Sequence, residues 1–150
     1  MKNAFFLNKS CLQPYRYDFK LSFFSDPLRK FYMSYNNVDA LTKHLNDSPE
    51  SVEFGDVIAL IDSAFTFTPT AFTNGEVTND ANQNNGSCKL LALGQHLQLS
   101  QGQTLALFGG FYRDDVLKNP DGDDHANIRN FMQSGHEGVS FEAFPLSVKS

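Results

Sequence analysis

Apolar residues recur with a helical period along most of the chain after residue 37, and this pattern predicts a mainly helical protein. The clearest stripe places apolar side chains at i, i+3, i+4, i+7 and i+11: Phe54, Val57, Ile58, Ile61 and Phe65. It predicts a helix over about 52–64, with Ser51 as its N-cap. A shorter stripe of the same kind predicts an amphipathic helix over 38–45.

Two more helices are predicted in the middle of the chain. The first covers about 88–98 and follows a polar loop that contains glycine, with Ser87 as its expected N-cap. The second begins at Ser100, because Ser100 and Gln103 have the residue types and spacing of a capping box. Both segments carry leucine on one face, so both are expected to pack against a common core.

The last third of the chain alternates helical segments with turn residues. One or two helical turns are predicted over 111–117, before the turn residues of 119–124. Asp123 or Asp124 is expected to cap the last helix, which Gly135 ends. This helix again carries its apolar residues at i, i+3 and i+4, and therefore has one buried face.

The pattern changes to that of a β-hairpin at roughly 66–79, where apolar residues alternate with threonine. Asn74-Gly75 is a strong hairpin turn signal, because both residues tolerate positive φ. Phe72 and Val77 are expected to face each other across this turn. Pro69 limits the first strand to an edge or a break, because proline cannot donate to a sheet.

A short alternating segment at 139–143 predicts a C-terminal strand that pairs with the hairpin. The expected fold is therefore α+β: a mainly helical single domain, with about five helices and a small antiparallel β-hairpin or sheet. This domain is expected to cover residues 33–150, and residues 1–32 differ from it in pattern.

Residues 1–32 are rich in aromatic side chains and have no sustained helical or strand period. Three interpretations fit this leader. It is an extension packed on the domain by its aromatic residues, a secretion-type leader whose first acid is Asp18, or an upstream addition to a natural start at Met33. The segment lacks the continuous apolar core and small-residue cleavage pattern of a signal peptide.

Charge is distributed unevenly and narrows the classes of function. The whole chain has a net charge of −5, but residues 33–150 carry six basic and fifteen acidic groups. An acidic body repels phosphate backbones, so nucleic-acid binding is not expected. No apolar run is long enough to predict a membrane span. The two cysteines, Cys11 and Cys88, do not form a disulfide framework, which favours a reducing compartment such as the bacterial cytoplasm.

Four phrases, in order along the chain, resemble the HopJ family, which is described as type III effector proteins: Phe67–Gly75, Asn82–Lys89, Gln103–Arg113 and Asp115–Met132. The resemblance covers about 40–145 and leaves out the aromatic leader. It implies a small bacterial protein that binds a partner. The effector name implies injection into a host cell.

Cys88 is the candidate nucleophile, because a thiol in the first turn of a helix lies near free N–H groups that favour its anion. His125, paired with Asp124, is the candidate base, with His96 as an alternative. Asn85 is a candidate oxyanion donor. Together these residues predict a cysteine-dependent hydrolase or transferase. The other interpretation is that Cys88 is a small buried residue and that Asp124 caps a helix.

A second set of polar residues is a candidate binding site for a small anionic group: Tyr112, Arg113, Arg129, Asn130 and Gln83. A surface salt-bridge network is the alternative for the arginines. The acidic turn at 121–124 lacks the spacing of a calcium loop, so it is read as a helix-capping turn. The sequence predicts no cofactor and no metal site. The edge of the hairpin is a candidate docking site for a strand of a protein partner.

These hypotheses share one geometric requirement. The loop-to-helix junction that ends at Cys88 and the junction that ends at His125 must fold against each other around a common hollow. The catalytic hypothesis also requires both side chains to open into that hollow.

Overall fold

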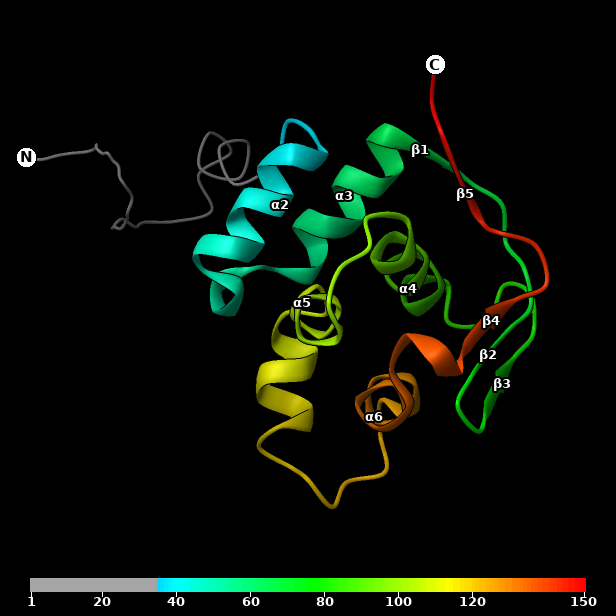
Figure 1. Ribbon diagram of the computed structural model, residues 1–150. Coiled ribbons are helices and arrows are strands. Elements are labelled where there is room, and N and C mark those ends of the chain that lie inside the picture. Colours follow the sequence, from blue (N-terminus) through cyan, green and yellow to red (C-terminus); the bar gives the residue numbers. More distant parts are fainter. Residues whose placement is uncertain (1–34) are drawn as a thin grey trace, which may run out of the picture. The chain divides into compact units, whose positions relative to one another are not determined.

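The computed structural model describes residues 35–150 (Figure 1), so the aromatic leader at 1–32 lies outside the described residues. The helices are α2 (Val38–Asp47), α3 (Phe54–Ala64), α4 (Asn85–His96), α5 (Gln101–Ala106), the π-helical segment η2 (Phe111–Val116) and α6 (Ala126–Ser134). The short 3-10 segments are η1 (Pro49–Ser51) and η3 (Gly135–Gly138). The strands are β1 (Phe65–Phe67), β2 (Phe72–Asn74), β3 (Val77–Asn79), β4 (Val139–Phe141) and β5 (Leu146–Val148). The predicted α+β class is confirmed.

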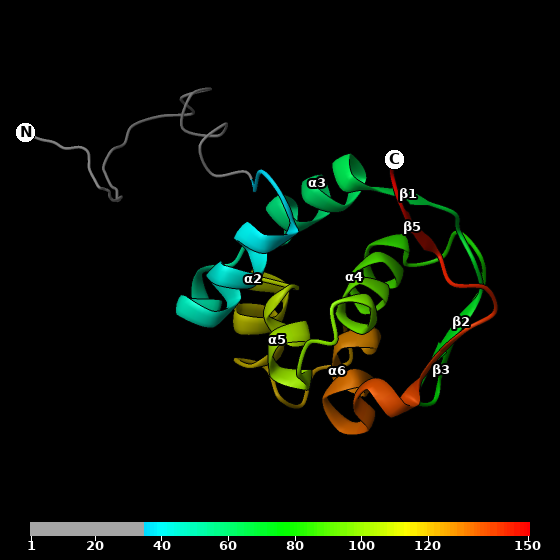
Figure 2. The ribbon, with the colours of Figure 1, turned by 45° about the horizontal axis from the view of Figure 1, so that its top comes forward.

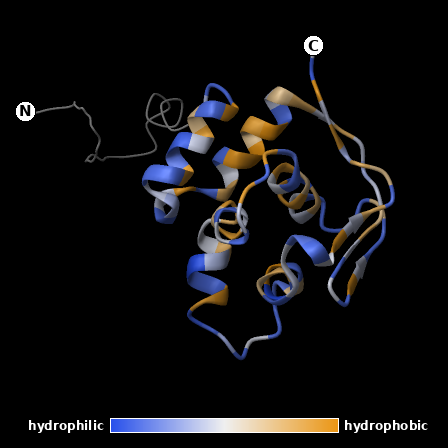
Figure 3. Ribbon diagram, in the orientation of Figure 1, coloured by the Kyte–Doolittle hydropathy of each residue, from blue (hydrophilic) through white to orange (hydrophobic). Residues whose placement is uncertain are grey.

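Helix α4 lies at the centre of the domain, and α3, α5 and β5 pack against it (Figures 1 and 2). Its residues Leu90–Gly94 are buried on every side. A helix that is apolar all round belongs inside a core rather than at its surface. The hydropathy colouring agrees, because the apolar segments of α3 and α4 lie toward the interior (Figure 3).

Gly94 lets α4 and α5 approach closely. A Cβ atom added at Gly94 would lie 2.6 Å from Oγ1 and 2.8 Å from Cγ2 of Thr104 on α5. The Thr104 side chain is itself held in place, because its hydroxyl donates to the carbonyl oxygen of Ser100 at 2.9 Å. The close packing of α4 on α5 therefore depends on the absence of a side chain at Gly94.

The strands form two small antiparallel sheets rather than one. A three-stranded sheet has the order β3-β2-β4, and β1 pairs separately with β5. The predicted pairing of the C-terminal strand with the hairpin is confirmed, since Thr73 of β2 is opposite Ser140 of β4. The chain leaves β1 before Pro69, in agreement with the predicted break. Strand β5 was not predicted.

The register of the hairpin corrects one prediction. Asn74 pairs with Val77, and Phe72 pairs with Asn79, so Phe72 does not face Val77. The two-residue turn is shifted by one position, from the predicted Asn74-Gly75 to Gly75-Glu76, with Gly75 at a φ of 62°. Because side chains alternate between the faces of a strand, this register directs both Asn74 and Asn79 to the buried face.

Helix starts agree with the sequence where the cap is a local motif. The capping box of Ser100 and Gln103 is confirmed, with both of its hydrogen bonds formed. The prediction of Ser51 as the cap of α3 is wrong, because that helix begins after Glu53. Helix α4 begins after Asn84, so Ser87 is its third residue and not its cap.

The start of α6 is also corrected, since its N-cap residue is His125 and not Asp123 or Asp124. Asn84 and His125 both have positive φ, at 55° and 51°. The chain therefore enters both α4 and α6 from the left-handed region. A search for Ser or Asp at the N-cap position does not anticipate such helix starts. Gly135 ends α6, as predicted.

Replacing Gly94 by alanine is expected to lower the free energy of unfolding by about 1–3 kcal/mol, because the added methyl group overpacks the contact with Thr104. Gly102→Ala in α5 is the matched control, since nothing lies within 4 Å of a Cβ atom there. Urea unfolding measures both variants. Equal stability of G94A and the parent would contradict the close packing of α4 on α5.

Candidate functional site

A cavity of about 380 Å³ lies where α3, η2 and the N-termini of α4 and α6 meet. One wall is aromatic and consists of Phe54, Phe108 and Phe111. The polar residues that line the cavity are Asn84, Ser87, His125 and Asn127. The two loop-to-helix junctions singled out in the sequence therefore do border a common hollow.

The N-terminus of α4 borders this cavity through Asn84, Gly86 and Ser87. The first intrahelical bond runs from the Cys88 amide to the Asn84 carbonyl, at 3.0 Å. The amides of residues 85–87 therefore have no acceptor inside the helix. Within residues 35–150, no side chain at the N-cap accepts from them either.

The N-terminus of α6 borders the same cavity through residues 125–128. Its first intrahelical bond joins the Arg129 amide to the His125 carbonyl at 3.1 Å, which leaves the amides of 126–128 without an intrahelical acceptor. Within the described residues, the N-cap side chain does not accept a hydrogen bond from these amides. Two helix ends with partial positive charge thus meet at one hollow, and such ends attract anions.

Four asparagines hold the two helix ends in place. Asn74, Asn79 and Asn127 are buried, and Asn84 joins them from the loop before α4. Asn127 of α6 donates to Asn79 Oδ1 at 3.0 Å, and Asn84 donates to the same atom at 2.7 Å. Asn74 donates to the Asn127 carbonyl at 2.7 Å. This asparagine cluster therefore ties β2 and β3 to both junctions.

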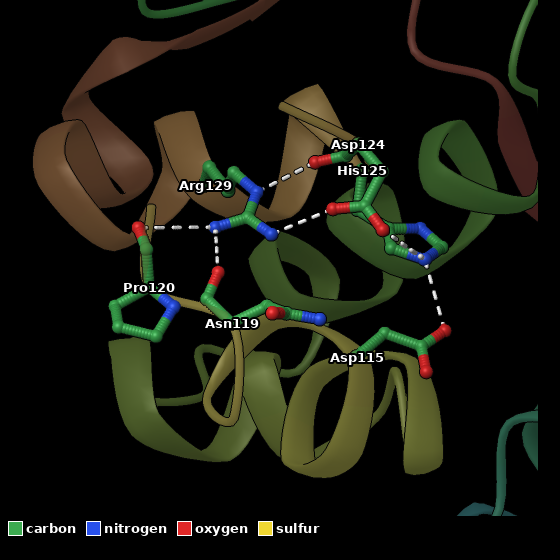
Figure 4. Close-up of polar contacts among 6 residues, drawn as sticks. All are labelled: Asp115, Asn119, Pro120, Asp124, His125 and Arg129. Atoms are coloured by element: carbon green, nitrogen blue, oxygen red, sulfur yellow. Dashed lines mark hydrogen bonds and ion pairs between the residues drawn. The ribbon is translucent and has the colours of Figure 1, made fainter. Parts of the chain in front are cut away.

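His125 lies against the aromatic wall and is oriented by a carboxylate. Its Nε2 is 3.0 Å from Asp115 Oδ2 on η2 and 3.8 Å from Asp124 Oδ2 (Figure 4). Its ring centroid lies 5.3 Å from that of Phe111. The imidazole is thus fixed at the edge of the cavity by contacts on two sides.

Arg129 is engaged in holding the loop before α6. Its Nε donates to the Asp124 carbonyl, its Nη1 donates to the Asn119 carbonyl at 2.9 Å, and its Nη2 pairs with Asp124 Oδ1 (Figure 4). The bond from Arg129 lowers the pKa of the Asp124 carboxyl below its ordinary value. The main partner of Asp124 is therefore Arg129. The sequence had suggested that Asp124 caps the helix or pairs with His125.

The other residues of the predicted anion-binding set also have structural contacts. Arg113 donates to the Val52 carbonyl at 2.8 Å and lies 3.4 Å from Glu53 Oε1. Asn130 Oδ1 accepts from the Glu76 amide, and Gln83 Oε1 accepts from the Asp80 amide. Tyr112 packs partly buried against the core. The structure thus places the positive charge of the cavity on helix ends rather than on these arginines.

Cys88 does not open into the cavity. It is 1% exposed and is absent from the cavity lining formed by the described residues. Burial raises the pKa of its thiol to about 11, although a backbone hydrogen bond with Thr70 and the charge of Lys89 act in the opposite direction. The expectation of a stabilised thiolate is therefore wrong, because desolvation of the buried thiol outweighs the contacts that favour its anion.

Asn85 and His96 complete the predicted catalytic set. Asn85 is the first residue of α4 and is half-buried, next to the cavity residues Asn84 and Gly86. His96 is exposed at the other end of α4, where its ring meets Phe65 edge-on at 5.3 Å. The structure therefore brings the base candidate His125 to the cavity, but not the thiol.

Sequence reasoning missed the asparagine cluster and the aromatic wall. The sequence predicts Asn74 only as a turn residue, Phe54 only as part of a helical stripe and Phe111 only as the start of a short helical segment. The one available signal was the burial register of the hairpin, which would have directed Asn74 and Asn79 inward. Contacts across more than fifty residues, such as Asn74 with Asn127, leave no local pattern.

The fold and the site define a small α+β protein in which a polar and aromatic cavity lies between two helix ends. The chain belongs to the HopJ family, because the family model described as HopJ type III effector protein matches residues 38–146. A crystal structure described as "unknown function protein VPA0580" is similar, at 49% identity and a TM-score of 0.75. The match covers 79% of this chain and 98% of that one. No match was found among curated proteins.

Among residues 35–150, no helix is long and apolar enough to cross a bilayer.

Asn127→Ala is expected to lower the free energy of unfolding by about 1–3 kcal/mol, because it leaves buried partners in the asparagine cluster without hydrogen bonds. Gln133→Ala, an exposed position on the same helix, is the control and is expected to change stability by less than about 0.5 kcal/mol. Urea unfolding compares the two. Equal effects would contradict a tying role for the cluster.

In a Cys11→Ser variant, iodoacetamide is expected to label Cys88 slowly from pH 6 to 9 and rapidly once urea unfolds the protein, because the buried thiol stays neutral. The raised pKa also has a stability consequence. The contribution of the neutral thiol to the free energy of unfolding is complete below the unfolded pKa of about 9. It is lost as the pH rises toward the folded pKa of about 11. Fast labelling of the folded protein near pH 7 would refute this description.

Proposed function

We propose that this HopJ-family protein acts by binding a small anionic ligand in the cavity between the N-termini of α4 and α6. The observation that carries the proposal is the meeting of two helix ends, neither with a side-chain cap among the described residues, at one cavity of about 380 Å³. Unpaired amides and the helix dipole both favour an anion there.

The expected affinity is modest. A charge near one helix N-terminus gains about 0.3–1 kcal/mol when exposed and up to about 2 kcal/mol when partly buried. Two converging ends, added to direct hydrogen bonds from the amides, are consistent with a dissociation constant in the micromolar to millimolar range. The rigidity of the asparagine cluster supports binding, because both ends are already in position before a ligand arrives.

The cavity favours binding over cysteine chemistry. Nucleophilic catalysis needs an exposed thiolate within reach of a base. Cys88 is buried with a raised pKa, whereas His125 lines the cavity. The cysteine-dependent hydrolase or transferase considered from the sequence has no support in this geometry.

The family description extends the proposal to the place of action. HopJ proteins are described as type III effectors, so the ligand or a protein partner is met inside a host cell after delivery from the bacterium. The net negative charge of residues 33–150 disfavours nucleic acid as the partner.

Titration of the ¹⁵N-labelled protein with sodium acetate and with inorganic phosphate tests the proposal, and sodium chloride at equal ionic strength is the reference. The amide signals of Gly86, Ser87 and Ala126 are expected to shift in a saturable way, since these residues border the cavity. Unmoved amides with every anion would refute the proposed function.

Ser87→Asp places a fixed carboxylate in the first turn of α4, at the border of the cavity. It is expected to weaken anion binding by about tenfold or more, and to leave the fold intact because an acid is favourable near a helix N-terminus. Gln133→Glu adds the same charge near the far end of α6 and is the matched control. Equal anion binding by S87D and Q133E would place the ligand elsewhere.

A further inference from the structure

We infer that the ligand of this cavity is a small aromatic monocarboxylate. The inference rests on the proposed function, because it assumes that the anionic group lies at the two helix ends. It adds the chemistry of the rest of the ligand, which follows from the aromatic wall, the size of the cavity and the charge beside it.

The aromatic wall favours a ligand that carries a flat, apolar ring. Phe54 and Phe111 meet edge to face with their ring centroids 5.0 Å apart. Phe111 also packs against the His125 ring, with the two centroids 5.3 Å apart. Phe111 is nevertheless 42% exposed, although it lies beside a cavity. A ligand ring can therefore stack or pack edge-on against a wall that is already fixed from both sides.

The volume sets the size of the ligand. Small-molecule sites usually enclose about 300–1,000 Å³, and this cavity, at about 380 Å³, lies at the small end of that range. It has room for a ring with its charged group.

The surroundings of the cavity oppose a second negative charge. A neighbouring hollow of about 410 Å³ shares Phe54 and Phe111 with the cavity, and its walls include Glu53, Asp114 and Asp115. The basic partners of these acids are only in part close: the Asp114–Lys118 pair is widely exposed, Arg113 lies 3.4 Å from Glu53, and Asp115 contacts the His125 ring at 3.0 Å. A ligand that extends past the aromatic wall therefore meets repulsion if its far end is anionic.

The arrangement of donors favours a carboxylate as the single anionic group. Residues of both helix N-termini line the cavity, and the first amides of each helix have no intrahelical acceptor. A carboxylate has two oxygens that share one charge, so each oxygen can accept from one helix end while an attached ring lies toward Phe111. A phosphate monoester carries close to two negative charges at neutral pH and meets the acids beside the wall.

The test is an NMR titration of the intact protein at pH 7.5 with four probes: benzoate, cyclohexanecarboxylate, terephthalate and inorganic phosphate. Benzoate is expected to bind about fivefold tighter than its saturated counterpart, which has the same charge and a similar size. Terephthalate, which adds a carboxylate at the far end of the ring, is expected to bind at least about fivefold more weakly than benzoate.

Phe111→Leu provides the structural control for the aromatic preference. It is expected to bring benzoate and cyclohexanecarboxylate to similar affinity, while the amide shifts at Ser87 and Ala126 persist. Phe144→Leu replaces another exposed phenylalanine, 47% exposed and outside the cavity lining of residues 35–150, and is expected to leave the preference unchanged.

The outcomes separate the two claims. Preference for benzoate that is lost in F111L, together with discrimination against terephthalate, supports the inference. Equal binding of benzoate and cyclohexanecarboxylate, or tighter binding of terephthalate or phosphate, overturns the inference and leaves the anion site standing. Absence of binding by all four probes overturns the proposed function and the inference together.

Discussion

The asparagine cluster is the interaction on which the rest of the site depends. Asn79 Oδ1 accepts from Asn127 at the start of α6 and from Asn84 at the start of α4. One buried oxygen therefore sets the spacing of two helix ends that belong to distant parts of the chain. Buried polar groups are costly when unpaired, so the cluster favours this one arrangement of hairpin and helices over others.

In the described part of the chain, neither helix end that the cluster positions has a side-chain cap, and α3 also lacks one, whereas α2 and α5 are capped. Helix α2 has a side-chain cap from Asn37, and α5 has a complete capping box. A side-chain cap typically adds about 1 kcal/mol, so α4 and α6 forgo stability that this chain obtains elsewhere. Both also begin from a non-glycine residue with positive φ, which is a strained conformation. Stability given up around one cavity is typical of a binding site.

The sequence predicted the structural features that are set by a few neighbouring residues. The helical stripe of α3, the capping box of α5 and the end of α6 at Gly135 each lie within a few residues, and the structure has all three. The hairpin turn is also present, but it is shifted by one residue from the predicted Asn74-Gly75. The same reasoning identified the two junctions that border the cavity, because polar loops before apolar helices are visible in a sequence.

The direction of each side chain at those junctions could not be predicted in the same way. Helix α4 begins three residues earlier than expected, which turns Cys88 into the core and brings Ser87 to the cavity. A shift of this size lies within the usual error for a helix boundary, yet it decides which residue meets the ligand. The partners of Asn74 and the aromatic pair of Phe54 and Phe111 arise from tertiary contacts, for which the chain carries no short-range pattern.

The most direct test of the central claim is a crystal structure of the protein with 4-bromobenzoate, in which anomalous scattering locates the bromine. The account predicts one bromine site beside Phe111, with the carboxylate at the amides of Ser87 and Ala126 and with α4 and α6 unmoved. A bromine bound on another face, or a carboxylate that avoids both helix ends, would contradict it.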